Sequence, residues 1–115
     1  MKNELIEKLR SFVSERDWQQ FHDPKNLAML LASEVGELVA ELRWIRNEDA
    51  DSKLQEEPIR ERVVDEIGDV VIAAFLLADR MGVDPIEAAL RKLEKNGKKY
   101  PQDLAKGKAE RPLRT

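Results

Sequence analysis

Four acidic residues stand in two pairs with the same spacing. Glu34 and Glu37 are three residues apart, and Glu66 and Asp69 repeat this spacing further along the chain. On a helix, side chains three residues apart lie about 5–6 Å from each other at Cβ, so both members of a pair can reach one ion. A carboxylate beside an apolar helix stripe is costly unless it is paired, protonated or bound to a cation. The two pairs therefore predict a site for a divalent cation.

The available ligands narrow the choice of ion. Carboxylate oxygens suit Mg²⁺, Mn²⁺ or Ca²⁺. The chain has no cysteine and a single histidine, His22, so it lacks the ligands that zinc and copper favour. We expect His22 to act in a loop or as a cap. A ferritin-like di-iron site needs Glu-x-x-His pairs, which are absent here. Because Mg²⁺ usually shares its coordination with substrate phosphates, the pattern favours phosphate chemistry. The alternative is that the four acids are solvated helix surface.

Four helices are expected to position these acids, which makes the fold class all-α. Apolar residues at helical spacing place the helices at residues 4–15, 24–45, 58–81 and 85–95. Asp23 and Asp84 each precede a proline, a typical N-cap followed by the first helical position. Gly82 is expected to end the third helix and Asn96-Gly97 the fourth. The acidic, aperiodic segment 47–57 is expected to be a loop.

The third helix has an unusual second half. From Val70 to Ala78 it is apolar around its whole circumference, which is typical of a helix buried on all sides. Three further helices offer little material to surround it, so we expect a symmetric dimer with this helix at or near the interface. The alternative is a monomer in which the other helices wrap it.

Charge divides the chain into two parts. Residues 1–90 carry 11 basic and 20 acidic side chains, whereas residues 91–115 carry 9 and 3. An acidic body does not favour non-specific binding to duplex nucleic acid. The basic end of the fourth helix could hold a polyphosphate or complement the helix terminus; its residues are Lys92, Lys95, Asn96, Lys98 and Lys99.

Other features complete the expected organisation. Residues 1–100 are expected to form one domain, followed by a basic tail at 101–115. Trp18 and Trp44 could stack on a nucleobase or serve as core. No apolar run reaches membrane-spanning length, and the N-terminus lacks the apolar centre of a signal peptide. Together with the absence of cysteine, this favours a cytoplasmic protein without membrane partners.

The arrangement of the acids resembles a known signature. An ExxE pair, 28 intervening residues and an ExxD pair are similar to the pattern of the MazG-type all-α nucleotide pyrophosphohydrolases. Four segments spread over residues 5–101 resemble the dCTP pyrophosphatase-like branch of that family: ERDWQQFHDPKNL, SEVGELVAEL, DEIGDVVI and KNGKKYP.

The resemblance implies a helical chain that forms a homodimer or homotetramer. It implies Mg²⁺-dependent cleavage, with Mn²⁺ as a substitute, of a nucleoside triphosphate such as dCTP or a modified nucleotide to the monophosphate and pyrophosphate. The metal-binding and catalytic residues would be Glu34, Glu37, Glu66 and Asp69. The base pocket would be lined by Trp18 and Trp44, and the phosphates would lie near Lys92, Asn96, Lys99 and Tyr100.

One departure from the branch concerns the base. Ala73 stands one turn after the ExxD acid, where the branch often has tyrosine, and this predicts a roomier pocket that could admit purines or modified bases. The rival hypothesis is a non-catalytic helical module that binds metal or forms dimers without turnover.

Overall fold

The computed structural model describes residues 4–109, and this part of the chain is helical without strands. The elements are α1 (Glu4–Glu15), the 3-10 helix η1 (Gln19–Phe21), α2 (Pro24–Leu42), α3 (Asn47–Lys53), α4 (Ile59–Arg80), α5 (Pro85–Lys99) and α6 (Gln102–Ala105). The all-α expectation is confirmed. The described residues form six α-helices rather than the four expected, and residues 110–115 of the predicted tail lie outside the described part.

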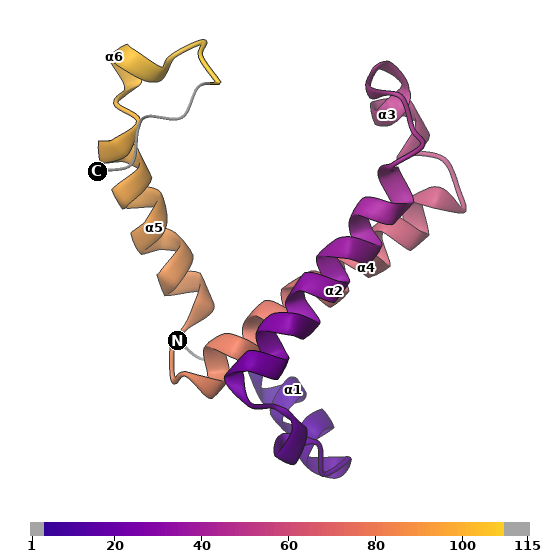
Figure 1. Cartoon of the computed structure of the whole chain (residues 1–115), viewed down its shortest axis with the longest axis vertical. Coiled ribbons are helices and arrows are strands. Elements are labelled where there is room, and N and C mark those ends of the chain that lie inside the picture. The colour runs from indigo at the N-terminus through magenta and orange to yellow at the C-terminus, as the bar shows by residue number, and fades with distance from the viewer. Residues whose placement is uncertain (1–3, 110–115) are drawn as a thin grey trace.

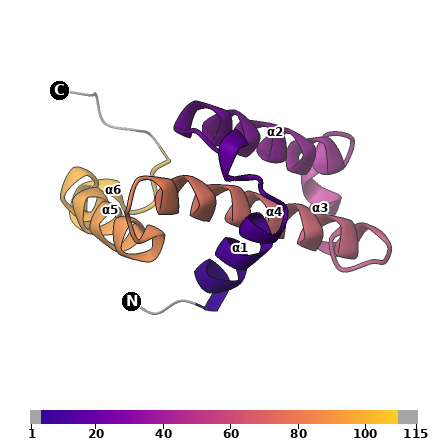
Figure 2. The ribbon, with the colours of Figure 1, turned by 90° about the horizontal axis from the view of Figure 1, so that it is seen from below.

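Two long helices organise the molecule. Figure 1 and Figure 2 both show α2 and α4 side by side in opposite directions, with α1 packed against α4. Beyond the end of α4, α5 turns away, so that α5 and the α2–α4 pair outline a V in Figure 1. The centre of the structure is therefore the seam between α2 and α4, and α5 is an arm attached at one end.

The core is small and lies where α1, α2 and α4 meet. Its fully apolar, buried residues are Leu9, Val13, Leu27, Val63, Ala73 and Phe75. Burial of the leucine, valine and phenylalanine side chains among them is worth about 1.5–3 kcal/mol each relative to exposure. Outside the core, Nε of Arg10 on α1 donates to Oδ1 of Asp79 on α4 at 3.1 Å, which ties these two helices together.

The predicted helix ends at Asp23, Gly82 and Asp84 are confirmed. Asp23 Oδ1 accepts a hydrogen bond from the Asn26 N–H at 2.8 Å. Asp84 caps α5 in the same way. Gly82 has a φ of +71°, and its N–H donates to the Asp79 carbonyl at 3.0 Å. This left-handed ending favours glycine because a Cβ would be strained there.

The segment 47–57 was wrongly expected to be a loop throughout. Its first part forms α3, although it has no apolar period. Glu48 and Asp49 lie in the first turn and Lys53 in the last, an order of charges that stabilises a helix dipole. Arg46, which precedes the helix, also donates hydrogen bonds to the Glu48 carboxylate. The position of acidic residues at its start and a basic residue at its end, rather than apolar spacing, therefore favours this short helix.

The predicted end of the fourth helix at Asn96-Gly97 is also wrong. α5 continues to Lys99, and the Tyr100 N–H donates to the Asn96 carbonyl at 2.8 Å. A glycine inside a helix costs only about 1 kcal/mol relative to alanine. Proline is the stronger stop because it disfavours helical backbone in the residue before it. Pro101 therefore ends the helix where the glycine does not.

The apolar run from Val70 to Ala78 is covered largely by its own chain. Ala73 and Phe75 are buried, and most of its other side chains are half-buried against α1 and α2. Large exposed apolar side chains lie both on the α2–α4 pair, where Val71 is 39% exposed, and on α5, where Leu90 and Leu93 are 61% and 67% exposed. Uncovered apolar surface therefore remains on α4 and is also found on the arm, and the expected interface between copies stays a prediction.

No helix in the described part of the chain is long and apolar enough to cross a membrane.

Candidate metal centre

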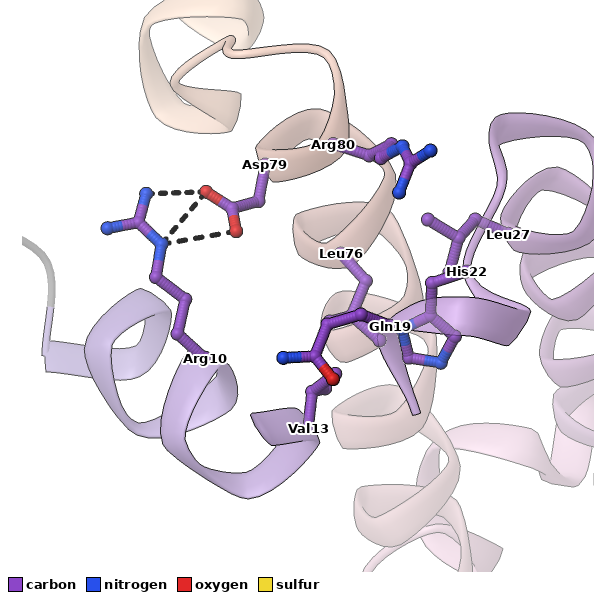
Figure 3. A pocket seen from close by; sticks show the side chains of 8 residues that line it. All are labelled: Arg10, Val13, Gln19, His22, Leu27, Leu76, Asp79 and Arg80. Carbon is purple, nitrogen blue, oxygen red and sulfur yellow. Dashed lines mark hydrogen bonds and ion pairs between the residues drawn. The ribbon is translucent and has the colours of Figure 1, made fainter. Parts of the chain in front are cut away.

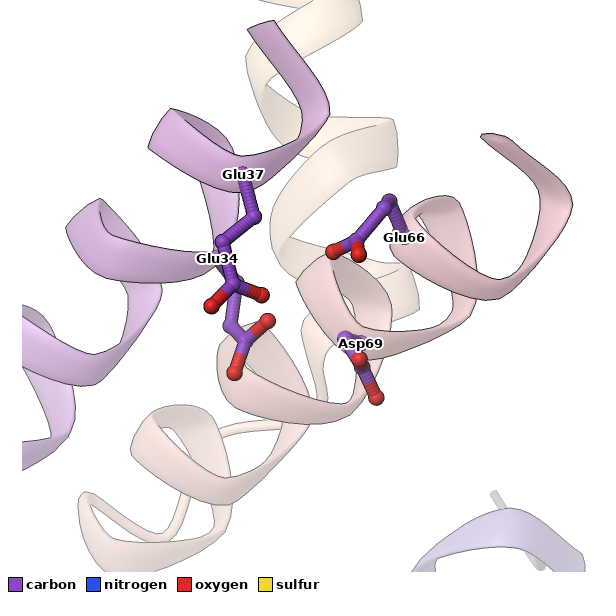
Figure 4. A group of neighbouring side chains, drawn as sticks. All are labelled: Glu34, Glu37, Glu66 and Asp69. Carbon is purple, nitrogen blue, oxygen red and sulfur yellow. The ribbon is translucent and has the colours of Figure 1, made fainter. Parts of the chain in front are cut away.

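The two acidic pairs meet across the seam between α2 and α4. Each of Glu34, Glu37, Glu66 and Asp69 offers a carboxylate oxygen, and these four oxygens all lie within 4.8 Å of one another. Figure 4 shows the pair from α2 facing the pair from α4. Because the helices run in opposite directions, two i, i+3 pairs placed in register form a compact four-sided cluster. The clustering inferred from spacing is present in the structure.

The cluster suits a hard divalent cation. Glu34 and Glu66 are half-buried, while Glu37 and Asp69 are exposed. One buried oxygen of each half-buried residue, Oε2, has no hydrogen-bond partner among the described residues. Buried carboxylate oxygens normally have partners, and leaving one unpaired is costly. All four donors are oxygens, which matches the preference of Mg²⁺ and Mn²⁺, so these residues fit such an ion.

The electrostatics of the cluster also favour a positive charge. Burial raises the pKa of Glu34, and its hydrogen-bonded neighbour Glu37 raises it further. Burial likewise raises the pKa of Glu66, with the charges of Glu37, Asp69 and Glu41 as further causes. Both effects arise because desolvation and nearby negative charges disfavour an ionised carboxyl. A bound cation would reverse this balance.

Sequence analysis missed two residues next to the cluster. Glu41 on α2 accepts a hydrogen bond from Arg62 on α4, with Nε and Oε2 3.1 Å apart. Glu41 follows Glu37 by four residues and Arg62 precedes Glu66 by four. Continuing the same antiparallel register by one turn would have found this pair, because residues four apart share a helix face.

The two tryptophans predicted to line the base pocket lie apart. Trp18 precedes α2 and Trp44 follows it, and the 19 residues between their helix ends span about 28 Å. Trp18 is 42% exposed and packs edge-on against Phe12, with ring centroids 5.7 Å apart. Trp44 is 84% exposed, and the Arg43 guanidinium carbon lies 5.3 Å from its ring centroid. Within one chain they do not form a common pocket.

The predicted phosphate-binding residues Lys92, Asn96, Lys99 and Tyr100 belong to the arm. All lie on α5 or directly after it. Figure 1 shows α5 leaving the end of α4 and diverging from the α2–α4 pair. A single chain therefore does not gather these side chains and the acidic cluster into one site.

A separate cavity of about 150 Å³ lies between α1, η1, α2 and α4. Figure 3 shows its apolar side chains Val13, Leu27 and Leu76, with His22 beside them. Its polar lining also includes Gln19, Arg80 and the Arg10–Asp79 ion pair. Ala73, expected to open space in the base pocket, is 0% exposed in the single chain.

The chain resembles known proteins over most of its length. A MazG-like family model matches residues 2–111. The chain is 38% identical over 98 residues to dCTP pyrophosphatase 1 of Bos taurus and 41% identical over 97 residues to that of Homo sapiens. These alignments cover 85% and 83% of this chain but only 58% and 56% of those proteins, so the chain spans little more than half of their length.

A solved structure adds a comparison of the folds. The crystal structure of a pyrophosphatase from Archaeoglobus fulgidus matches with a TM-score of 0.78 and 42% sequence identity. The match covers 85% of this chain and 90% of that one. By its sequence and its fold, the chain belongs to the MazG-like family.

Proposed function

We propose that this protein is a Mg²⁺- or Mn²⁺-dependent nucleoside triphosphate pyrophosphohydrolase that forms a nucleoside monophosphate and pyrophosphate. The observation that carries this proposal is the four-carboxylate cluster, with its two buried and unpartnered oxygens. The names of the relatives, dCTP pyrophosphatase 1 and a pyrophosphatase, support this reaction class and favour dCTP or a related nucleotide as substrate.

The reaction would use the cluster in two ways. Glu34, Glu37, Glu66 and Asp69 would hold a divalent cation, which when bound supplies Lewis-acid polarisation and lowers the pKa of water. Glu34 and Glu37 are the two candidates for the carboxylate that orients the attacking water and takes its proton. The water oxygen forms a bond to the α-phosphorus. The bond between that phosphorus and the bridging oxygen breaks, and pyrophosphate departs with the bridging oxygen.

We also propose that a second copy of the chain completes the site. Ile86, Leu90 and Leu93 form an apolar stripe on α5, and all three are exposed, between 40% and 67%. Further exposed apolar side chains lie on the α2–α4 pair, among them Val39 and Ile67. If the arm of one copy packs on the α2–α4 pair of another, the stripe is buried. The basic end of α5 from one copy would then approach the acidic cluster of the other copy. Within a single chain, the basic end and the cluster lie apart (Figure 1).

The cavity supports a single-ring base. Leu27 lies seven residues before Glu34 on α2, and Leu76 lies seven residues after Asp69 on α4. Seven residues span about 10.5 Å of helix and return to nearly the same face. A cavity of about 150 Å³ accommodates one aromatic ring. We therefore place a pyrimidine base in the cavity, with the triphosphate directed along the seam toward the acids.

A panel of nucleotides tests this function. The protein is incubated with Mg²⁺ and each of dCTP, dTTP, dUTP, dATP and dGTP, and products are separated by anion-exchange chromatography. We expect pyrophosphate and monophosphate in equal amounts, with pyrimidines preferred. A preference for purines would contradict the proposal that the base binds in the cavity. Release of no pyrophosphate from any nucleotide, with either Mg²⁺ or Mn²⁺, would favour the non-catalytic metal-binding or dimerisation module.

A further inference from the structure

An ion pair continues the acidic cluster by one helical turn. Arg62 Nε donates to Glu41 Oε2 at 3.1 Å and joins α4 to α2. Because the helices are antiparallel, the side chains cross the seam as successive rungs: Glu34 faces Asp69, Glu37 faces Glu66, and Glu41 faces Arg62. Glu41 also acts electrostatically on Glu66, which places this last rung beside the candidate metal centre.

Arg62 is the cation nearest to the cluster along these two helices. The basic residues within α2 and α4 are Lys25, Arg60, Arg62 and Arg80. Arg62 is one turn from Glu66, whereas Arg60 lies further along α4 and donates to Gln55 at 2.9 Å. Lys25 and Arg80 lie at the opposite end of the pair, more than two turns from Glu34 and Asp69, the nearest acids of the cluster. Among the basic residues within α2 and α4, Arg62 is thus the one at the edge of a site that receives a polyanion.

The guanidinium of Arg62 retains most of its hydrogen-bonding capacity. It has five N–H donors, and only Nε–H is engaged by a side chain in the described part of the structure. Its side chain is 55% exposed, whereas that of Glu41 is 26% exposed. A planar guanidinium with free terminal nitrogens matches the oxygen spacing of phosphate groups. Glu41 fixes one edge of that plane and leaves the other edge available.

We propose that Arg62, held by Glu41, binds the pyrophosphate end of the triphosphate substrate and the pyrophosphate product. This inference rests on the proposed function. Its terminal N–H groups donate to non-bridging phosphate oxygens, and its positive charge offsets charge that builds up on the departing pyrophosphate. In this role Arg62 contributes from the same chain what the lysines of α5 contribute from a second copy.

The experiment measures polyphosphate binding and metal binding separately. Inorganic tripolyphosphate is titrated by calorimetry into wild type, Arg62→Gln and the matched control Arg60→Gln, each saturated with Mg²⁺. Mn²⁺ binding without phosphate is followed by electron paramagnetic resonance. We expect Arg62→Gln to weaken tripolyphosphate binding about tenfold or more, the loss of a charge-assisted hydrogen bond. Arg60→Gln should stay within about twofold of wild type, and neither variant should bind Mn²⁺ more weakly.

Two further variants separate a phosphate contact from a structural clamp. Arg62→Lys keeps the charge without the planar fork, so it should recover only part of the lost affinity. Glu41→Gln should weaken tripolyphosphate binding less than Arg62→Gln does. Equal affinity in wild type and Arg62→Gln would overturn the inference while leaving the proposed function intact. Equal losses of Mn²⁺ and tripolyphosphate affinity in Arg62→Gln would also overturn it, because Arg62 would then be only a clamp.

Binding of Mn²⁺ and tripolyphosphate by the wild type distinguishes failure of the proposed function from failure of the inference alone. If it binds Mn²⁺ but no tripolyphosphate, the proposed function and the inference fall together. Helical circular dichroism of each variant checks that the fold is kept, which the exposure of Arg62 favours.

Discussion

Glu34 on α2 and Asp69 on α4 face each other across the seam, with a carboxylate oxygen of each within 4.8 Å of the other. The rest of α2, the short helix α3 and the first turns of α4 separate them in the sequence, so the antiparallel packing of α2 and α4 brings them together. Two negative groups at this separation repel each other in a medium that is partly shielded from water. This repulsion makes the metal-free protein sensitive to pH and to the loss of either charge.

The first prediction concerns the stability of the metal-free protein at different pH values. Burial and nearby carboxylates raise the pKa of Glu34 above its usual 4.5. The folded state therefore binds more protons than the unfolded state above that pH, and the free energy of unfolding should fall as pH rises through this range. Urea unfolding in EDTA, repeated at a series of pH values above 4.5, should show this fall. Saturating Mg²⁺ should abolish it.

Substitution of the acid tests the cause of this pH dependence. Glu34→Gln removes one of the repelling charges, so the metal-free variant should be at least as stable as wild type at pH 8 and should show a flatter dependence. Glu94→Gln, an exposed acid on α5, is the matched control and should behave like wild type. A wild-type protein whose stability rises steadily from pH 5 to pH 8 would contradict the expected sign.

The second prediction separates the roles of the two tryptophans. Trp44 is 84% exposed, so Trp44→Ala should change the free energy of unfolding by less than about 1 kcal/mol, whereas a core tryptophan would cost about 3–5 kcal/mol. If a second copy brings Trp44 to the base, KM should rise while the melting temperature stays unchanged. An unchanged KM would remove Trp44 from the substrate site.

The third prediction concerns Trp18, whose ring contacts Phe12 edge-on. Loss of this aromatic pair in Trp18→Ala should cost at least about 0.5–1.5 kcal/mol of stability. Trp18 directly precedes Gln19, which lines the cavity, so KM should also rise if the base lies there. Phe12→Leu provides the comparison: it removes the ring pair and should lower stability, but it leaves Trp18 available to the substrate. Equal KM values in Trp18→Ala and Phe12→Leu would show that the rise in KM comes from lost packing alone.

The fourth prediction concerns the arm. Leu90 is 61% exposed within one chain, so Leu90→Asp should leave the helical fold intact while separating the copies. Light scattering with size-exclusion chromatography should show a smaller species than wild type, and activity should fall with it. Ala88→Asp, on the opposite side of α5, introduces the same charge and should keep the wild-type assembly. A wild type that is monomeric at all concentrations would contradict the proposed second copy.

The sequence predicted those features that depend on local chemistry. The caps at Asp23 and Asp84, the glycine stop at Gly82 and the clustering of the acids follow from short-range spacing. The helix at residues 47–53 was missed because its support is charge order rather than apolar period.

The features of the site that the sequence did not predict arise from packing between distant segments. Neither the separation of Trp18 from Trp44 nor the divergence of α5 from the acids can be inferred from residue types. The Arg62–Glu41 pair could have been predicted from the sequence, since its prediction requires only the antiparallel register of α2 and α4. That register could be proposed once two facing acidic pairs had been recognised.

The most direct measurement is Mn²⁺ binding, followed by electron paramagnetic resonance, together with pyrophosphate release from dCTP in the same samples. Wild type should bind Mn²⁺ and release pyrophosphate. Glu34→Gln and Asp69→Asn should each lose about tenfold or more in Mn²⁺ affinity and nearly all turnover, with helical circular dichroism unchanged, while Glu94→Gln should match wild type. If both cluster variants bind Mn²⁺ as tightly as wild type and release pyrophosphate at the same rate, the four carboxylates are not the metal centre.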